Sequence, residues 1–135
     1  MTNDPLLEKV HKNARTGLFT VPKMKDQSTD ERFRAELSIQ ETEYQNLFTS
    51  AERENGGEAL KIGSFAKLRS AAMIGLAGND TSKQAQMLIL GSTMGIVDVT
   101  RALKQNPDAP KKTKMLAGDF LAIEERNVEI LKQFL

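Results

Sequence analysis

The sequence contains no cysteine and no tryptophan, and it has only one histidine and one tyrosine. The absence of cysteine excludes disulfides, thiolate metal sites and thiol nucleophiles, and it fits a reducing compartment. Because six phenylalanines and the tyrosine are the only aromatic residues, the core must consist mainly of aliphatic side chains. That composition favours packed helices over a β-sandwich.

An excess of charge and a long apolar segment are also missing. Nineteen Lys and Arg against 18 Asp and Glu leave a net charge of +1, so we expect no nucleic-acid partner. The uncharged segment from Met87 to Val97 is shorter than the roughly 18 residues that a membrane span requires. Residues 1–10 lack the basic and apolar regions of an export signal. We therefore expect one globular domain over residues 1–135, located in the cytoplasm.

Apolar residues recur at steps of three and four in five segments, which is the pattern of an amphipathic helix. The predicted helices span about 5–26, 29–54, 59–77, 81–105 and 109–134. Asp4 before Pro5 is typical of a helix start, and the S-x-x-E pattern from Ser28 to Glu31 predicts a capping box. The pattern does not decide whether Pro22 kinks the first helix or ends it.

The connections between the predicted helices indicate the fold. The first and last connections are only a few residues long, so each joins an antiparallel hairpin. The shorter helix 59–77 is long enough to carry the chain back between the two hairpins. The sequence thus predicts an all-α, antiparallel four-helix bundle of the ferritin-like type, with an additional crossover helix.

A ferritin-like bundle builds a dinuclear metal site from glutamates and E-x-x-H pairs that project inward. The predicted helix 29–54 carries Glu41 and Tyr44 at this spacing, and the last helix carries Glu124 and Asn127. His11 lies beside the apolar stripe of the first helix, which favours a boundary or surface position. The candidate ligands for iron or manganese are therefore Glu41, Glu124, His11 and Tyr44.

The same positions have an interpretation that needs no metal. Tyr44 and Asn127 lie on the apolar stripes of their helices, as do Gln40 and Ser92. These four residues are predicted to form a buried polar layer that fixes helix register through hydrogen bonds. On this interpretation the protein has no cofactor, and iron or manganese is the alternative.

Catalytic motifs are missing as well. The sequence has no G-x-S-x-G elbow and no phosphate-binding P-loop, so we predict no catalytic residue and lean against an enzyme. Gly91 and Gly95 form a G-x-x-x-G pattern, which lets another helix approach closely. That approach is either internal packing or a contact in a homodimer.

Three segments carry a resemblance to a known family. Lys12-Asn13-Ala14, the segment 91–96 and the segment 123–129 resemble uncharacterised bacterial ferritin-like helical proteins. The resemblance covers most of the chain and implies the ferritin-like fold. It also implies that Glu41 and Glu124 occupy the carboxylate positions of the second and fourth bundle helices.

Three functional hypotheses follow from these patterns. The first is a non-enzymatic bundle that acts through self-association or partner binding on an apolar or glycine-containing helix face. The alternative is a divergent ferritin-like protein that binds a metal ion in its core. A third hypothesis is that the apolar segment from Ala71 to Leu76 detaches to meet a partner or a membrane surface.

Overall fold

The computed structural model describes residues 4–57 and 74–135, and within these ranges the chain is all-α, as predicted. The long helices are α1 (Pro5–Gln27), α2 (Glu31–Glu54), α4 (Thr81–Gln105) and α5 (Lys111–Leu131), and a short 3-10 helix, η1 (Lys132–Phe134), follows α5. Residues 74–77 are also helical. Most of the predicted helix 59–77, including the start of the segment expected to detach, lies outside the described residues. No helix in the described ranges is long and apolar enough to cross a membrane.

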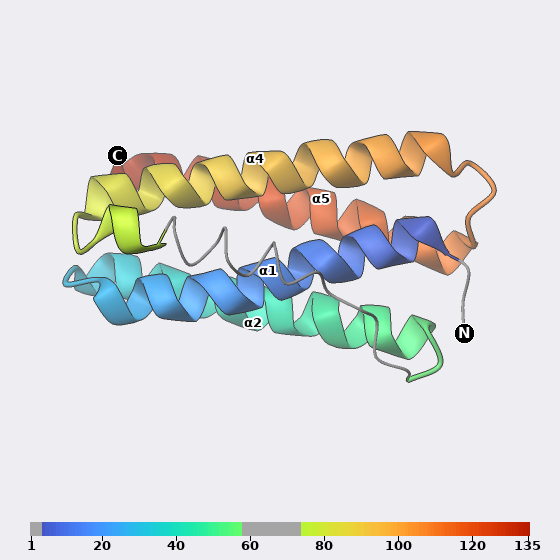
Figure 1. The fold of residues 1–135 in the computed structure, drawn as a ribbon, viewed down its shortest axis with the longest axis horizontal. Coiled ribbons are helices and arrows are strands. Elements are labelled where there is room, and N and C mark those ends of the chain that lie inside the picture. Colours follow the sequence, from blue (N-terminus) through green and yellow to red (C-terminus); the bar gives the residue numbers. More distant parts are fainter. Residues whose placement is uncertain (1–3, 58–73) are drawn as a thin grey trace.

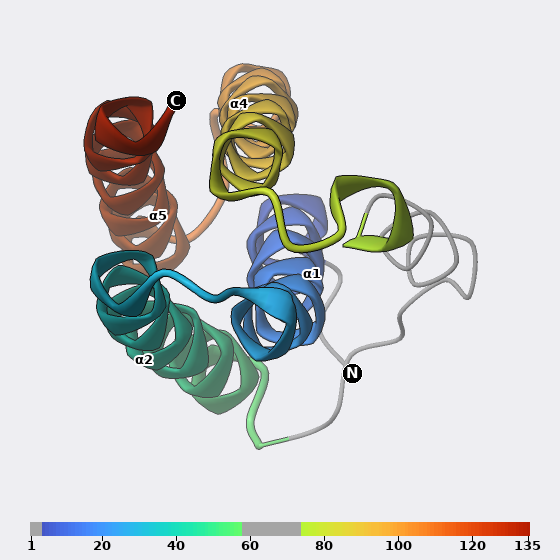
Figure 2. The same ribbon diagram turned by 90° about the vertical axis from the view of Figure 1, so that its left-hand side faces the viewer.

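The four long helices lie lengthwise, side by side (Figure 1). Seen from one end, α1 lies beside α2 and α4, and α5 lies beside the same two helices on the opposite corner (Figure 2). The colour gradient in Figure 1 shows that each neighbouring pair runs antiparallel. This arrangement brings residues from all four helices to a common centre.

The helix starts follow local capping rules, with one departure from expectation. Asp4 accepts a hydrogen bond from the Leu7 amide at 3.1 Å, as the Asp4-Pro5 pair predicts. The predicted capping box at Ser28 is wrong, because Asp30 caps α2 and accepts from the Phe33 amide at 2.9 Å. Ser28 instead ends α1, where its own amide donates to the Lys25 carbonyl. Because α2 begins only at Glu31, the residue directly before it is Asp30, and Ser28 lies too early in the chain to be its N-cap.

Two proline positions resolve the remaining helix bounds. The first helix continues through Pro22 to Gln27, and the buried Met24 keeps the apolar stripe facing the core. The last helix begins at Lys111 rather than at residue 109, because Pro110 has an extended backbone with ψ of 145°. Helix α4 has the predicted bounds, with Asp80 capping its start and Asn106 at its end.

At one level of α4 and α5, a glycine and a glutamate occupy core positions where aliphatic residues are usual. Gly95 and Glu124 are buried, whereas the adjacent Ile96 and Ile123 are only partly buried. The two buried residues come from neighbouring helices and lie against each other. Aliphatic and phenylalanine side chains fill the core on either side of this level.

Candidate functional site

The Glu124 carboxyl lies at the centre of the helices, and only 3% of the residue is exposed. Its Oε1 atom accepts a hydrogen bond from the Tyr44 hydroxyl of α2. The Ser92 hydroxyl of α4 donates to the same oxygen over 3.5 Å. In the described part of the chain, Glu124 has no ion-pair partner. The central feature of the described structure is therefore a buried carboxyl that two hydroxyls contact and that no described cation pairs with.

Two glycines make room for this pair. A Cβ atom on Gly17 of α1 would lie 2.6 Å from the Tyr44 ring, so no larger residue fits without a shift. A Cβ atom on Gly95 of α4 would lie 3.2 Å from Glu124 Oε2 and also 3.2 Å from Phe120 Cζ. Gly91, in contrast, faces open space. In the G-x-x-x-G pattern, Gly95 therefore packs inside the protein, whereas a Cβ atom on Gly91 would contact no other described helix.

Burial sets the protonation of the site. Removal from water raises the pKa of Glu124 to about 7, although the hydrogen bonds from Tyr44 and Ser92 and the nearby Asn127 amide favour the ionised form and limit the rise. Burial and the neighbouring Glu124 charge raise the pKa of Tyr44 well above its usual value. At neutral pH the phenol is therefore protonated, and the carboxyl is divided between its two forms.

A pocket of about 470 Å³ opens between α1 and α4 and reaches this carboxyl. Its buried floor includes Tyr44, Ser92 and Glu124, which come from three different helices. Apolar side chains, among them Leu88 and Val97 of α4, line its wall. The pocket is thus mainly apolar, with a polar floor.

The mouth of the pocket carries charged side chains. Lys12 and Arg101 are exposed there, and neither forms an ion pair within the described ranges. Asp98 is paired, because Lys9 Nζ lies 3.2 Å from Oδ1 and Asn13 donates to Oδ2 at 2.9 Å. Partial burial of Asp98 favours protonation, but these two partners hold its pKa below the ordinary value. Among the described residues, the mouth therefore carries the positive charges of Lys12 and Arg101 beside the paired Asp98.

The structure brings together only two of the four predicted metal ligands, Tyr44 and Glu124. Glu41 is partly exposed on α2, where its Oε1 lies 3.8 Å from Lys25 Nζ. The residues that the structure describes include no group of three or more His, Asp or Glu side chains placed to hold a metal ion. Binding of iron or manganese by these residues stays a prediction, which elemental analysis of the purified protein can test.

The expectation of a boundary or surface position for His11 is wrong, since only 1% of the residue is exposed. Its ring lies 4.7 Å from that of Phe48, and Nε2 lies 3.5 Å from Glu52 Oε2. The close packing of α1 on α2 covers the imidazole, which apolar periodicity alone did not reveal. Burial lowers the pKa of His11, although the Glu52 carboxylate opposes the shift.

The residues predicted as a polar layer, Gln40, Tyr44, Ser92 and Asn127, are all buried. Tyr44 and Ser92 donate to Glu124, whereas Gln40 donates to Glu36 at 3.3 Å. Glu124 was not among the residues predicted for this layer. Its position is four residues after Phe120 and three before Asn127, which matches the core stripe and is the signal that points to its burial.

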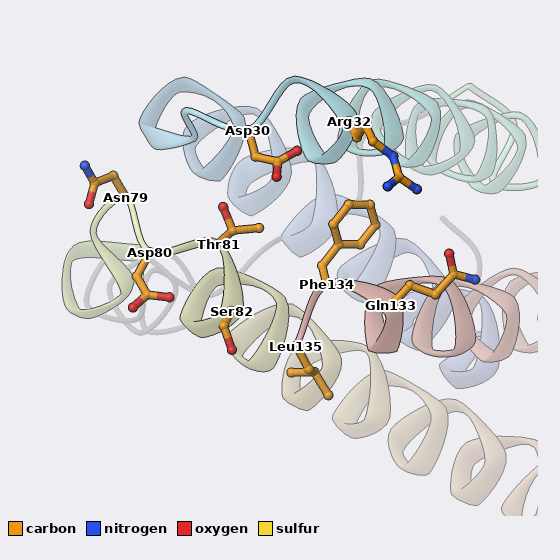
Figure 3. Close-up of a pocket in the computed structure, with 9 residues that line it drawn as sticks. All are labelled: Asp30, Arg32, Asn79, Asp80, Thr81, Ser82, Gln133, Phe134 and Leu135. Atoms are coloured by element: carbon orange, nitrogen blue, oxygen red, sulfur yellow. The ribbon is translucent and has the colours of Figure 1, made fainter.

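A second hollow, of about 580 Å³, lies at one end of the helices (Figure 3). It is lined by the starts of α2 and α4 and by the C-terminal residues, including Phe134. The carboxylates of Asp30 and Asp80 are already engaged there, because each caps its own helix. Among its lining residues, this hollow therefore has no buried carboxyl with a free hydrogen-bonding side, unlike Glu124 in the central pocket.

No protein-family model, no curated protein and no solved structure matches this chain.

Proposed function

We propose that this protein binds a small organic ligand in the pocket between α1 and α4, with Glu124 as the polar anchor. The observation that carries the proposal is the buried carboxyl at the pocket floor, which has no cation beside it in the described chain. A buried carboxyl without a compensating charge lowers stability, so a purely structural core gains nothing from it. A largely apolar cavity of several hundred Å³ with a few polar groups at its floor is typical of ligand sites.

The site suits binding better than catalysis. Tyr44 and Ser92 fix Oε1 of Glu124, while Oε2 lies beside Gly95. A hydrogen-bond donor on the ligand takes this second oxygen, and the apolar wall contacts the rest of the ligand. Glu124 is a single acid/base group, and no described side chain stands beside it as an activated nucleophile.

A ligand screen with matched variants tests the proposal. Compounds that bind the pocket should raise the melting temperature and shift the methyl NMR signal of Met87, which lines it. Glu124→Gln should lose these responses, because it removes the anionic acceptor while keeping the side-chain shape. Glu125→Gln is the control, because Glu125 is exposed on the same helix. Hits that bind the Glu124→Gln protein equally well would contradict the proposal.

A second candidate function is self-association through α4. Leu90, Met94 and Val97 are 49%, 45% and 49% exposed, and their spacing places them on one face of the helix. Leu90→Glu should then reduce dimer formation in sedimentation velocity experiments. Ile39→Glu, at an exposed apolar position on α2, is the control and should leave the dimer intact. A monomer at all accessible concentrations would contradict this candidate.

For the fold we propose the ferritin-like four-helix bundle. Its support is the pair of antiparallel hairpins α1–α2 and α4–α5 and the long connection between them. We further propose that the protein acts in the cytoplasm, which the lack of cysteine supports. An experimental structure and fractionation of the source cells are the respective tests.

A further inference from the structure

We propose that the ligand is a monoamine with an apolar body, whose ammonium group pairs with the Glu124 carboxylate. This inference rests on the proposed function and specifies the ligand class for the same pocket. Its basis is the hydrogen-bonding character of the floor and the distribution of charge between the floor and the mouth.

The floor is arranged around the ionised form of Glu124. The Tyr44 and Ser92 hydroxyls both donate to Oε1, and the buried Asn127 amide lies near enough to favour the same ionised state. A carboxylate accepts up to about four hydrogen bonds, so the Oε2 side keeps acceptor capacity. A ligand that donates hydrogen bonds complements this floor, and an ammonium group also supplies the missing countercharge.

No cation of the described chain fills that role. The guanidinium of Arg126, on the same helix, pairs with Glu43. Lys12 and Arg101 lie at the exposed mouth, apart from the buried floor. A ligand cation would therefore neutralise a carboxylate that residues 4–57 and 74–135 leave without a countercharge.

The mouth and wall restrict the rest of the ligand. Apolar side chains such as Met87, Leu88 and Val97 line the wall, so an alkyl or aryl body fits beyond the amine. The positive charges of Lys12 and Arg101 would repel a second ammonium group at the outer end. The site therefore favours a monoamine over a diamine or polyamine.

The titration of Glu124 predicts the direction in which amine affinity should change with pH. Besides Glu124, the titratable or charged side chains among the described residues that line the pocket are Lys12 on α1, Tyr44 on α2, and Asp98 and Arg101 on α4. Of these four, only Tyr44 contacts Glu124. Because the pKa of Glu124 is about 7, the ionised fraction falls about tenfold between pH 8 and pH 6. An amine that requires the carboxylate should bind about tenfold more weakly at pH 6 and should release protons when it binds near pH 7.

Isothermal titration calorimetry with hexylamine, hexanol, hexanoate and 1,6-diaminohexane tests the inference on the full chain. Hexylamine stays an ammonium ion across this pH range, as a lysine side chain does. We expect hexylamine to bind most tightly, with affinity rising with pH and with heats that depend on the buffer's ionisation enthalpy. Glu124→Gln should abolish hexylamine binding, and Glu125→Gln should retain it. Circular dichroism of both variants checks folding.

Tyr44→Phe provides a second variant that keeps the ring beside Gly17. Loss of its hydroxyl removes a hydrogen bond that favours the ionised carboxyl, so the midpoint of the pH dependence should move upward. Hexanol binding with no preference for the amine would overturn the inference and leave the proposed function standing. Hexanoate binding that strengthens at low pH would overturn it too, because that pattern requires a protonated Glu124 donor. Failure of these probes and of the wider ligand screen would overturn both proposals.

Discussion

The Glu124 carboxyl should make the folding stability of this protein depend on pH in a defined direction. Its pKa rises from an ordinary 4.5 to about 7 in the folded state, so the folded chain holds a proton that the unfolded chain releases. The stabilising effect of this proton is complete below pH 4.5 and is lost as the pH rises through 7. Replacement by Gln mimics the protonated form and removes this dependence.

The expected magnitude follows from the size of the shift. Between pH 5 and pH 8, the linkage relation gives a change of about 2 to 3 kcal/mol in the free energy of unfolding of the wild type relative to Glu124→Gln. Taking the difference between the two proteins removes the contributions of other titrating groups that the substitution leaves unchanged. The wild type should therefore become progressively less stable than the variant as the pH rises.

Urea denaturation followed by circular dichroism, at several pH values from 5 to 8, measures this difference. Glu125→Gln removes the same charge from an exposed position and should show almost no pH-dependent difference from the wild type. A stability difference between the wild type and Glu124→Gln that stays constant over this range would refute the reasoning, because the carboxyl would then have an ordinary pKa.

Five further substitutions test a buried titratable group, helix packing and helix capping. Burial lowers the pKa of His11 from 6.5, so His11 should remove stability as the pH falls below 6.5. The free energy of unfolding of the wild type relative to His11→Gln should therefore be lower at pH 5 than at pH 7 in urea melts. Gly17→Ala should destabilise by about 1 to 3 kcal/mol in urea melts, because its Cβ would lie 2.6 Å from an aromatic ring, whereas Gly91→Ala, in open helical space, should stabilise by up to about 1 kcal/mol. Asp30→Ala should lower the unfolding free energy by about 1 kcal/mol, and Ser28→Ala by clearly less, because Asp30 is the true N-cap; equal losses would contradict that assignment.

Local signals in the sequence were sufficient for the helices whose ends are set by neighbouring residues. Asp80 before α4, and the Asn106-Pro107 pair after it, act within one turn, so the bounds of α4 match the prediction. The Ser28 prediction failed because two adjacent helix ends compete for the same short segment. Which residue caps α2 depends on where α1 ends, and the capping pattern alone does not contain that information.

The central site was only partly predictable, for a related reason. Hydrophobicity favours Ile123 over Glu124 as the core residue, since carboxylates are rarely buried. The burial of Glu124 depends on Tyr44, which is 80 positions away in the sequence, and on the small Gly95 of α4. Such partners become visible only when the helices are assembled. The four residues of the predicted polar layer are buried, but the prediction did not include Glu124, the group that Tyr44 and Ser92 contact.

The most direct test of this account is a carbon-13 NMR titration of the Glu124 side-chain carboxyl, with and without saturating hexylamine. We predict a midpoint near pH 7 in the free protein and a downward shift of at least about one pH unit with the amine, because a bound cation favours the carboxylate. A midpoint near the ordinary 4.5 that the amine leaves unchanged would contradict both the buried anchor and its proposed ligand.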